Sequence, residues 1–427
     1  MRILFAHNLP YLPALNGAAR VGRCLLEGLV RRNHNCRVVS LAGTDNEKLR
    51  QLASRGSSPL KLLDLSPTRQ TFIHNGVEVY AFAGNPRLHE QLNHHIREFD
   101  PTWVIISEDP TYMLLAAANK IDPRRTLFFS QSQATLPFGP EAFTTEPHKM
   151  QMLEEVAGIL TSSEYLRTYM RRWGGLESFF AAIPVYGVPP FRHLGFFDNR
   201  FVTMINPSTI KGLPIFLELA RKFPAVEFAA VPTWATLATD RSALKSLPNV
   251  TVLEASEDID DVFAQTRVLM VPSLWGEAFG LVAVEAMLRG IPVLASNVGG
   301  LPEAKLGVDY VLPLRPIEKY EDRRDESWIP VPVIPDQNIA PWETALRTVL
   351  SDKAEFDRIS SDSRKAATDY VSGLSVIPTE RYLEELLLQR SSFTGSERQK
   401  DDMSKLLEGL SPEKLQALAT LLKKKTP

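Results

Sequence analysis

One run in the second half of the chain constrains the fold more than any other part of the sequence. It begins at Trp275, passes through Gly276-Glu277-Ala278-Phe279-Gly280 to Glu285, and continues to Gly299-Gly300-Leu301-Pro302-Glu303. The glycines allow a tight turn that leaves backbone N–H groups pointing outward, and the helix expected after it adds about half a positive charge at its N-terminus. This combination predicts a binding site for a phosphate group.

Two carboxylates of this run, Glu277 and Glu285, define the rest of the expected ligand. Glu285 stands about five residues into the expected helix and therefore about 7 Å further along its axis. This is close to the separation between a diphosphate and the ribose of the same nucleotide. Carboxylates beside a phosphate are favourable only if they accept hydrogen bonds from hydroxyl groups. The run therefore predicts a phosphorylated, sugar-containing ligand.

Short apolar runs alternate with amphipathic helical patterns along the chain, which is typical of a doubly wound α/β protein. Expected strands include 3–6, 103–107, 126–130, 201–205 and 268–271, and expected helices include 18–31, 87–99 and 213–221. The segment Tyr186-Gly187-Val188-Pro189-Pro190 interrupts the alternation near its middle. We therefore expect two Rossmann-like domains facing a central cleft, with ligands beyond the carboxyl ends of the strands.

The run 275–303, together with Pro272-Ser273 before it, resembles the E-x7-E signature of the retaining glycosyltransferases with the GT-B fold, family 4 (glycosyl transferases group 1). The resemblance covers approximately residues 1–390. It implies that Glu285 binds the ribose hydroxyls, and that Glu277 and Lys211 serve catalysis. It also implies that the donor sugar and its phosphates are held by Glu277 and the amides after it, at Ala278, Phe279, Gly280 and Leu281.

The resemblance assigns three further positions, and this chain departs from the family at each. Gly17 would bring its backbone close to the reacting centre, but Asn16 replaces the other glycine of the usual pair; asparagine tolerates the left-handed conformation. Gln131 stands where many members have a histidine that contacts the donor sugar. Glutamine can hydrogen-bond a sugar hydroxyl but cannot act as an acid or base.

The third departure concerns the diphosphate. Lys211 matches the lysine that grips it in the family, whereas Asn206 stands where an arginine is usual. Asparagine supplies hydrogen bonds but no charge. Lys211 and the helix N-terminus would then provide most of the compensation, and an arginine from elsewhere, such as Arg20, could share it.

Other candidates rest on position alone. Trp234 follows an expected strand and could stack on a base, line the cleft or only pack. His7 and the pair Glu108-Asp109 also follow strands, which makes them acceptor-side candidates. The only cysteines, Cys24 and Cys36, have no disulfide or metal spacing. We expect no metal and no cofactor besides the nucleotide sugar as co-substrate.

The expected organisation has four parts. Residues 1–192 form an acceptor-side domain, 193–372 a nucleotide-sugar-binding domain with a hinge near 187–199, 373–390 a helix crossing back to the first domain, and 391–427 a linker and amphipathic helical tail. The tail needs a partner surface, either on this chain or on another protein. Acceptor identity is expected to reside in first-domain loops at 42–75 and 134–148. The Pro-rich, charged stretch 313–339 is expected to be a solvated surface excursion.

The sequence thus predicts a retaining, metal-independent glycosyltransferase that moves a sugar from a nucleotide diphosphate, by default a UDP-sugar, to a small-molecule or carrier-bound acceptor. Segments 137–140 and 232–234 and the tail are similar to a branch associated with natural-product biosynthesis. Two alternatives stay open: a nucleotide-sugar-binding protein that has lost turnover, and a GT-B nucleotide-sugar epimerase. The net charge of −2 argues against nucleic acid as a partner. Without a long apolar stretch or signal peptide, we expect no transmembrane segment and a cytoplasmic location.

Overall fold

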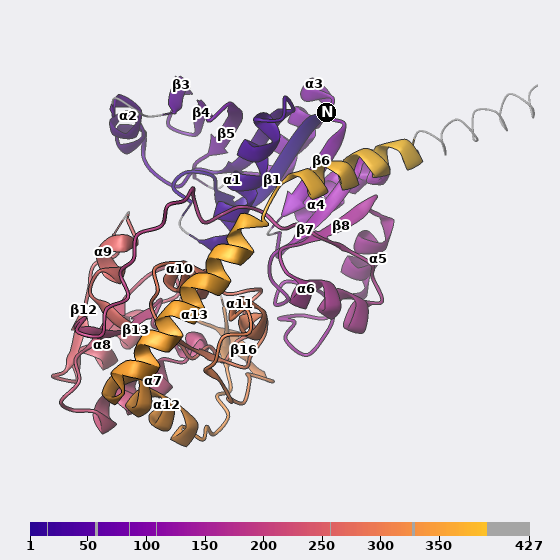
Figure 1. Ribbon diagram of the computed structural model, residues 1–427. Helices are drawn as coiled ribbons and strands as arrows, with labels where there is room; N and C mark the ends of the chain where they lie inside the picture. Colours follow the sequence, from indigo (N-terminus) through magenta and orange to yellow (C-terminus); the bar gives the residue numbers. More distant parts are fainter. Residues whose placement is uncertain are drawn as a thin grey trace, which may run out of the picture. The chain divides into compact units, whose positions relative to one another are not determined.

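The computed structural model describes residues 1–14, 16–55, 59–84, 86–107, 109–256, 258–326 and 329–390. Residues 1–378 form one unit, and a second unit begins at Thr379. The first unit contains two helix-covered sheets, which define a first domain (β1 to β9) and a second domain (β10 to β15) (Figure 1). The tail at 391–427, for which an amphipathic helix is predicted, lies outside the described residues.

The first domain is built on a nine-stranded sheet with the order β3-β4-β5-β2-β1-β6-β7-β8-β9. Neighbouring strands from β5 to β9 run parallel. The central strands are buried, as expected for a parallel sheet with helices on its faces. The strands are β1 (Arg2–Pro10), β2 (Asn35–Leu41), β3 (Leu60–Leu65), β4 (Arg69–His74), β5 (Val77–Phe82), β6 (Trp103–Ser107), β7 (Thr126–Ser130), β8 (Gly158–Thr161) and β9 (Phe179–Phe180).

Helices join these strands, so that the carboxyl ends of β1, β6 and β7 open onto the same edge of the sheet. The helices are α1 (Gly17–Val30), α2 (Asn46–Ser54), α3 (Leu88–Phe99), α4 (Met113–Ile121), α5 (Pro147–Glu155) and α6 (Glu164–Tyr169), with short helical turns at Pro123–Arg125 and Met170–Gly174. The boundaries of α1 and α3 lie within a residue of the predicted ones.

Segment 42–75, expected as a loop, contains α2 and an antiparallel ladder of β3 and β4 that extends the sheet beyond β5. The sequence of β3, Leu-Lys-Leu-Leu-Asp-Leu, breaks the apolar alternation that reveals a half-buried strand after Leu62, and only Leu60 is buried. Pairing with β4 decides its conformation, and that pairing is a tertiary contact.

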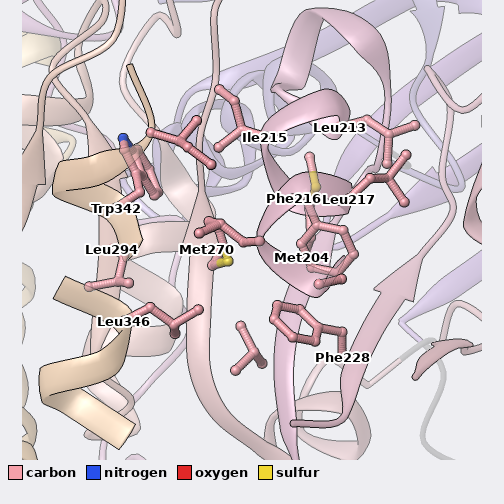
Figure 2. Close-up of a cluster of buried hydrophobic side chains, with 14 of the residues drawn as sticks. Met204, Leu213, Ile215, Phe216, Leu217, Phe228, Met270, Leu294, Trp342 and Leu346 are labelled. Atoms are coloured by element: carbon pink, nitrogen blue, oxygen red, sulfur yellow. The ribbon is translucent and has the colours of Figure 1, made fainter. Parts of the chain in front are cut away.

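The second domain has a six-stranded parallel sheet with the order β12-β11-β10-β13-β14-β15. Figure 2 shows its core, in which Phe216 and Met204 pack on one side and Trp342 and Leu346 on the other. The strands are β10 (Phe201–Ile205), β11 (Phe228–Val231), β12 (Val250–Val252), β13 (Thr266–Val271), β14 (Val293–Ser296) and β15 (Val311–Leu312). The helices are η3 (Thr209–Lys211), α7 (Leu213–Lys222), α8 (Ala238–Lys245), α9 (Asp260–Phe263), α10 (Leu281–Leu288), α11 (Leu301–Ala304), α12 (Ala340–Ser351) and α13 (Lys353–Ser372).

The stretch 313–339, expected to be a solvated surface excursion, is only partly exposed. Its charged residues do form an exposed hairpin of β16 (Tyr320–Arg324) and β17 (Pro330–Pro332). However, Leu314, Ile317 and Ile329 are buried in the core of the second domain. Those apolar side chains, spaced between prolines and charges, anchor the stretch, so it is not simply a solvated excursion.

Two segments connect the domains. After β9 the chain enters the second domain, where Arg364 of α13 donates to the carbonyls of Phe191 and Arg192 at 2.7 and 3.1 Å. After α13 the chain returns to the first domain, because the amide of Ser375 donates to the carbonyl of Ala182 at 3.2 Å. A further helix covers 377–390, and from Thr379 onward it belongs to the second unit.

Candidate functional site

The run 275–303 forms a glycine loop, defined here as Gly276–Gly280, followed by α10. Gly280 has φ of +115°, and a Cβ there would stand 2.6 Å from Leu301 Cδ2, so both conformation and space require glycine. Gly300 donates its amide to the carbonyl of Glu277 at 2.7 Å. The distant glycine pair of the motif therefore fixes the shape of the glycine loop.

The loop leads directly into α10, whose first amides have no intrahelical acceptor. Gly280 is the N-terminal cap residue but has no side chain to satisfy them. Glu285 is the fifth residue of the helix, as predicted. Its carboxylate is 6% exposed and lies on the face of α10 that meets the first domain. The site thus offers unpaired backbone donors at one end and a carboxylate about one helical turn away.

Lys211, at the end of η3, brings the site its ammonium group. Lys211 Nζ lies 2.7 Å from Glu277 Oε1, and both side chains are largely buried. The same ammonium stands 5.0 Å from the centre of the Trp275 ring and 6.0 Å from that of Trp234. Trp234 is 47% exposed. The structure therefore brings Lys211, Glu277 and Trp234 together at the edge of the second sheet.

Asn206 has a different environment from the one its alignment implies. Its φ of +59° is left-handed, and its side-chain oxygen accepts from the amide of Ala235 at 3.2 Å. The side chain thereby fastens the turn that carries Trp234. In this structure Asn206 positions a neighbouring loop, and its amide side chain brings no charge to the site.

On the first domain, α1 approaches α10. A Cβ on Gly17 would lie 3.1 Å from Leu281 Cδ1, so close approach explains the glycine. Asn16 is extended, with φ of −130°, and its side chain caps α1 by accepting from the amide of Ala19 at 2.9 Å. The expectation that Asn16 suits a left-handed conformation was therefore wrong: it is a helix cap.

Arg20 also reaches the site. Its guanidinium pairs with Glu285 at 2.5 Å across the domain interface and donates to the carbonyl of Val185 at 3.3 Å. The pair joins the residue expected to hold ribose to a cation of the first domain. Arg20, Lys211, Glu277 and Glu285 together carry no net charge.

Three polar residues gather at the carboxyl ends of β1, β6 and β7. The Gln131 amide donates to Ser107 Oγ at 2.9 Å and to the carbonyl of Ala18 at 3.2 Å, while its oxygen is buried without a partner in the described structure. His7, opposite Ser107 in the β1–β6 ladder, also has a buried Nε2 without a described partner. Burial lowers the pKa of His7 to about 3. The cluster thus encloses a neutral imidazole and an amide oxygen that accept no hydrogen bond from the described residues.

Glu108 lies outside the described residues. Its neighbour Asp109 accepts hydrogen bonds from Asn8 Nδ2 and from the amide of Leu115, both at 3.0 Å. Burial raises the pKa of Asp109. Asp109 therefore stabilises the ends of β1 and α4.

Sequence reasoning missed four first-domain residues that contact the run 275–303. Gln133 and Ser163 contact the glycine loop, and Glu164 and Tyr165 contact Glu303. Gln133 donates to the carbonyl of Gly276, and its amide also donates to Glu141 at 2.7 Å. Ser163 donates to the carbonyl of Ala278 at 2.5 Å. Glu303 accepts from the amides of Glu164 and Tyr165 at 3.1 and 2.8 Å. Only Ser163 had a local signal, since serine before a short helix is a typical cap.

The geometry defines a class of protein: two Rossmann-like domains whose carboxyl edges meet around a phosphate-type helix N-terminus, which is the GT-B arrangement. Solved structures agree. Sucrose-phosphate synthase from Thermosynechococcus elongatus matches with a TM-score of 0.62 and 15% identity, covering 93% of this chain and 98% of that one. Anabaena Alr3699/HepE in complex with UDP-glucose matches with a TM-score of 0.60 and 17% identity, covering 91% and 100%. The predicted fold is confirmed.

Sequence comparison finds similarity to glycosyltransferases over part of the chain. Residues 235–305 match the family model of glycosyl transferases group 1. D-inositol 3-phosphate glycosyltransferase from Mycolicibacterium smegmatis is 35% identical over 134 residues, which is 29% of each chain. The chain thus aligns with less than a third of that relative's length. Together with the fold, these matches show that residues 235–305 are similar to glycosyl transferases group 1 within a chain that has the GT-B fold. In its described part, no helix has the length and apolar character needed to span a membrane.

Proposed function

We propose that the protein is a retaining, metal-independent glycosyltransferase that transfers a sugar from a UDP-sugar to a small-molecule or carrier-bound acceptor. One observation carries the proposal: the ion pair of Lys211 and Glu277 lies beside the loop that leads into α10, and Glu285 stands about one helical turn along the same helix. Anabaena Alr3699/HepE, which shares the fold, was solved with UDP-glucose, and this supports a uridine donor.

In the proposed reaction the diphosphate lies against the amides of Phe279 to Leu281, with Lys211 beside it. These groups stabilise the negative charge that grows on the leaving diphosphate, which is electrostatic catalysis. Glu277 accepts hydrogen bonds from the donor sugar, and Glu285 from the ribose. His7 cannot serve as a base near neutral pH because its burial-lowered pKa of about 3 leaves it a poor proton acceptor. The departing diphosphate itself would then take the proton of the acceptor hydroxyl.

Thermal shift with UDP and with UDP-, ADP- and GDP-sugars tests donor binding. A ligand at about 100-fold over its Kd stabilises the fold by about 2.7 kcal/mol, which for a domain of this size raises Tm by about 5–10 °C. We expect that shift with a uridine nucleotide, its loss in Glu277→Ala, and its retention in the control Glu218→Ala at an exposed position of α7. If none of the nucleotides or nucleotide sugars raises the Tm of the wild type, the proposal is contradicted.

A second candidate, nucleotide-sugar binding without turnover, is favoured by one feature: Asn206 replaces a cation beside Lys211 and is engaged with Ala235. Product analysis separates the candidates. The proposal is supported if the sugar is transferred to an acceptor, if NMR shows that the product retains the anomeric configuration of the donor, and if EDTA leaves the transfer activity unchanged. Binding without hydrolysis or transfer supports the second candidate, and a new nucleotide sugar formed without acceptor would indicate an epimerase.

A further inference from the structure

The glycine loop is held by hydrogen bonds from both domains, and the pattern is regular. The carbonyls of three consecutive residues, Gly276, Glu277 and Ala278, each accept a hydrogen bond. The middle one accepts from Gly300 of its own domain. The outer two accept from the first domain, through Gln133 and Ser163.

We propose that Gln133 and Ser163 are positioning residues that set the glycine loop when the two domains meet, so that donor binding depends on domain closure. The inference rests on the proposed function for the identity of the donor. It concerns a step that the donor-binding residues do not themselves perform, namely the orientation of the peptide groups that present the amides.

The physical link is the planarity of the peptide group. A trans peptide directs its C=O and the following N–H to opposite sides. When Ser163 holds the carbonyl of Ala278, it therefore also fixes the direction of the Phe279 N–H, the amide at the start of the α10 N-terminus. With glycine at 276 and 280, the loop alone has the conformational freedom to present these amides in several directions.

The two first-domain clamps are connected to each other. Glu141 accepts from the Gln133 amide and from the Tyr165 hydroxyl, both at 2.7 Å. Both acceptors of the Gln133 amide, Glu141 and the Gly276 carbonyl, lack a proton to donate, so the amide group must face them with its NH₂. Tyr165 lies two residues after Ser163, at the start of α6. The network Gly276–Gln133–Glu141–Tyr165 thereby returns to the second clamp at Ser163.

The second domain completes this arrangement through Glu303, in the same motif as the glycine loop. Ser163 caps the Leu166 amide at 3.1 Å, and Glu303 receives the amides of Glu164 and Tyr165. Two of the first three amides of α6 are therefore satisfied by the second domain, and the third by Ser163 itself. Separation would leave two of them to water and release both loop carbonyls at once.

The close approach also explains Gly276. A Cβ there would stand 1.8 Å from Glu141 Oε2 and 2.3 Å from Gln133 Nε2. Those atoms are the ends of side chains and could move, but moving them breaks the Gln133 clamp. Gly276 has no positive φ that alanine would resist, so Gly276→Ala perturbs the clamp without straining the loop itself.

Substitutions can remove the donor atom and keep the other role of each residue. Ser163→Asp retains a helix cap for α6 but cannot donate to Ala278, whereas Ser163→Thr retains both. Gln133→Glu keeps the size of the side chain and loses the donated hydrogen bond. Gln151→Ala and Ser372→Ala, at exposed positions of α5 and α13, are the matched controls.

The test has two readouts. Small-angle scattering of the ligand-free protein reports domain separation, and UDP titration reports affinity. We expect Ser163→Asp, Gln133→Glu and Gly276→Ala to increase the radius of gyration and to weaken UDP binding about tenfold, the usual consequence of losing such a bond. Ser163→Thr and both controls should match the wild type.

The outcomes separate the two proposals. If the wild type binds UDP and the three variants keep its affinity and its radius of gyration, the clamp is refuted while the proposed function stands. If the wild type binds no nucleotide, the proposed function fails, and the scattering data alone still decide whether the clamp holds the domains together. A Tm equal to that of the wild type confirms that a variant has folded.

Discussion

Lys305 provides a quantitative test of how this fold handles a buried charge. It directly follows α11, two residues after the motif residue Glu303, and it is 0% exposed. Its ammonium donates to the carbonyl of Val293 at 2.6 Å. Burial lowers the pKa of Lys305 to about 7, while the nearby Asp309 acts in the opposite direction.

The sign follows from proton binding. In the unfolded chain Lys305 titrates near its ordinary pKa of about 10.4, so between pH 7 and 10 the unfolded state binds more protons than the folded state. Stability therefore rises with pH across this window. At about 1.36 kcal/mol per pH unit, the charge costs about 4 kcal/mol at pH 7 and about 1 kcal/mol at pH 10.

Lys305→Met removes this cost but leaves the Val293 carbonyl without its donor, at about 1–2 kcal/mol. The variant should be about 2–3 kcal/mol more stable than the wild type at pH 7 and about equal to it at pH 10. Chemical denaturation followed by tryptophan fluorescence at several pH values measures the difference. Taking differences cancels the titration of other groups, such as Cys36, whose pKa burial raises to about 12.

The exposed Lys365→Met on α13 serves as the control and should show a small, pH-independent difference. Parallel curves for the wild type and Lys305→Met from pH 7 to 10 would refute the reasoning. They would mean that the folded protein hydrates or otherwise stabilises the ammonium in place.

Three further changes test the site. Gly280→Ala places a Cβ at φ of +115° and 2.6 Å from Leu301 Cδ2. We therefore expect a loss of about 1–3 kcal/mol in unfolding free energy and weaker UDP binding. Unchanged UDP affinity would show that the glycine loop does not contact the donor. In a double-mutant cycle, Arg20→Met and Glu285→Gln should show a coupling of about 1–3 kcal/mol in unfolding free energy, because their ion pair crosses the domain interface and Glu285 is buried. Additive effects would show that this ion pair does not stabilise the interface. Trp234→Ala should weaken UDP-sugar binding about three- to tenfold if the exposed ring contacts donor, and calorimetry showing equal Kd values would assign Trp234 to packing alone.

Much of the architecture was predictable because the signals are local. Strands β6, β7 and β10 have the predicted boundaries, since continuous apolar runs between turns identify buried parallel strands. The misses share a cause. Strands β3 and β4 lack a regular apolar alternation, and the anchoring of 313–339 depends on three apolar residues meeting a core formed by distant segments.

The candidate site divides in the same way. The glycine loop, the place of Glu285 in α10 and the need for Lys211 nearby follow from spacing within one run and from the family resemblance. The tertiary structure decided that Arg20 meets Glu285, that Asn16 is a cap, and that Gln133 and Ser163 contact the loop.

The sequence by itself therefore determined the two Rossmann-like domains and the glycine loop, because periodicity, turn residues and motif spacing act within a few residues. Only the tertiary structure decided which groups of the first domain face this loop. Those partners lie more than 100 residues away in the chain, at 143 residues for Gln133 and Gly276 and 115 for Ser163 and Ala278. Serine and glutamine at such positions carry no distinguishing pattern until the fold brings them to the carbonyls that they hold.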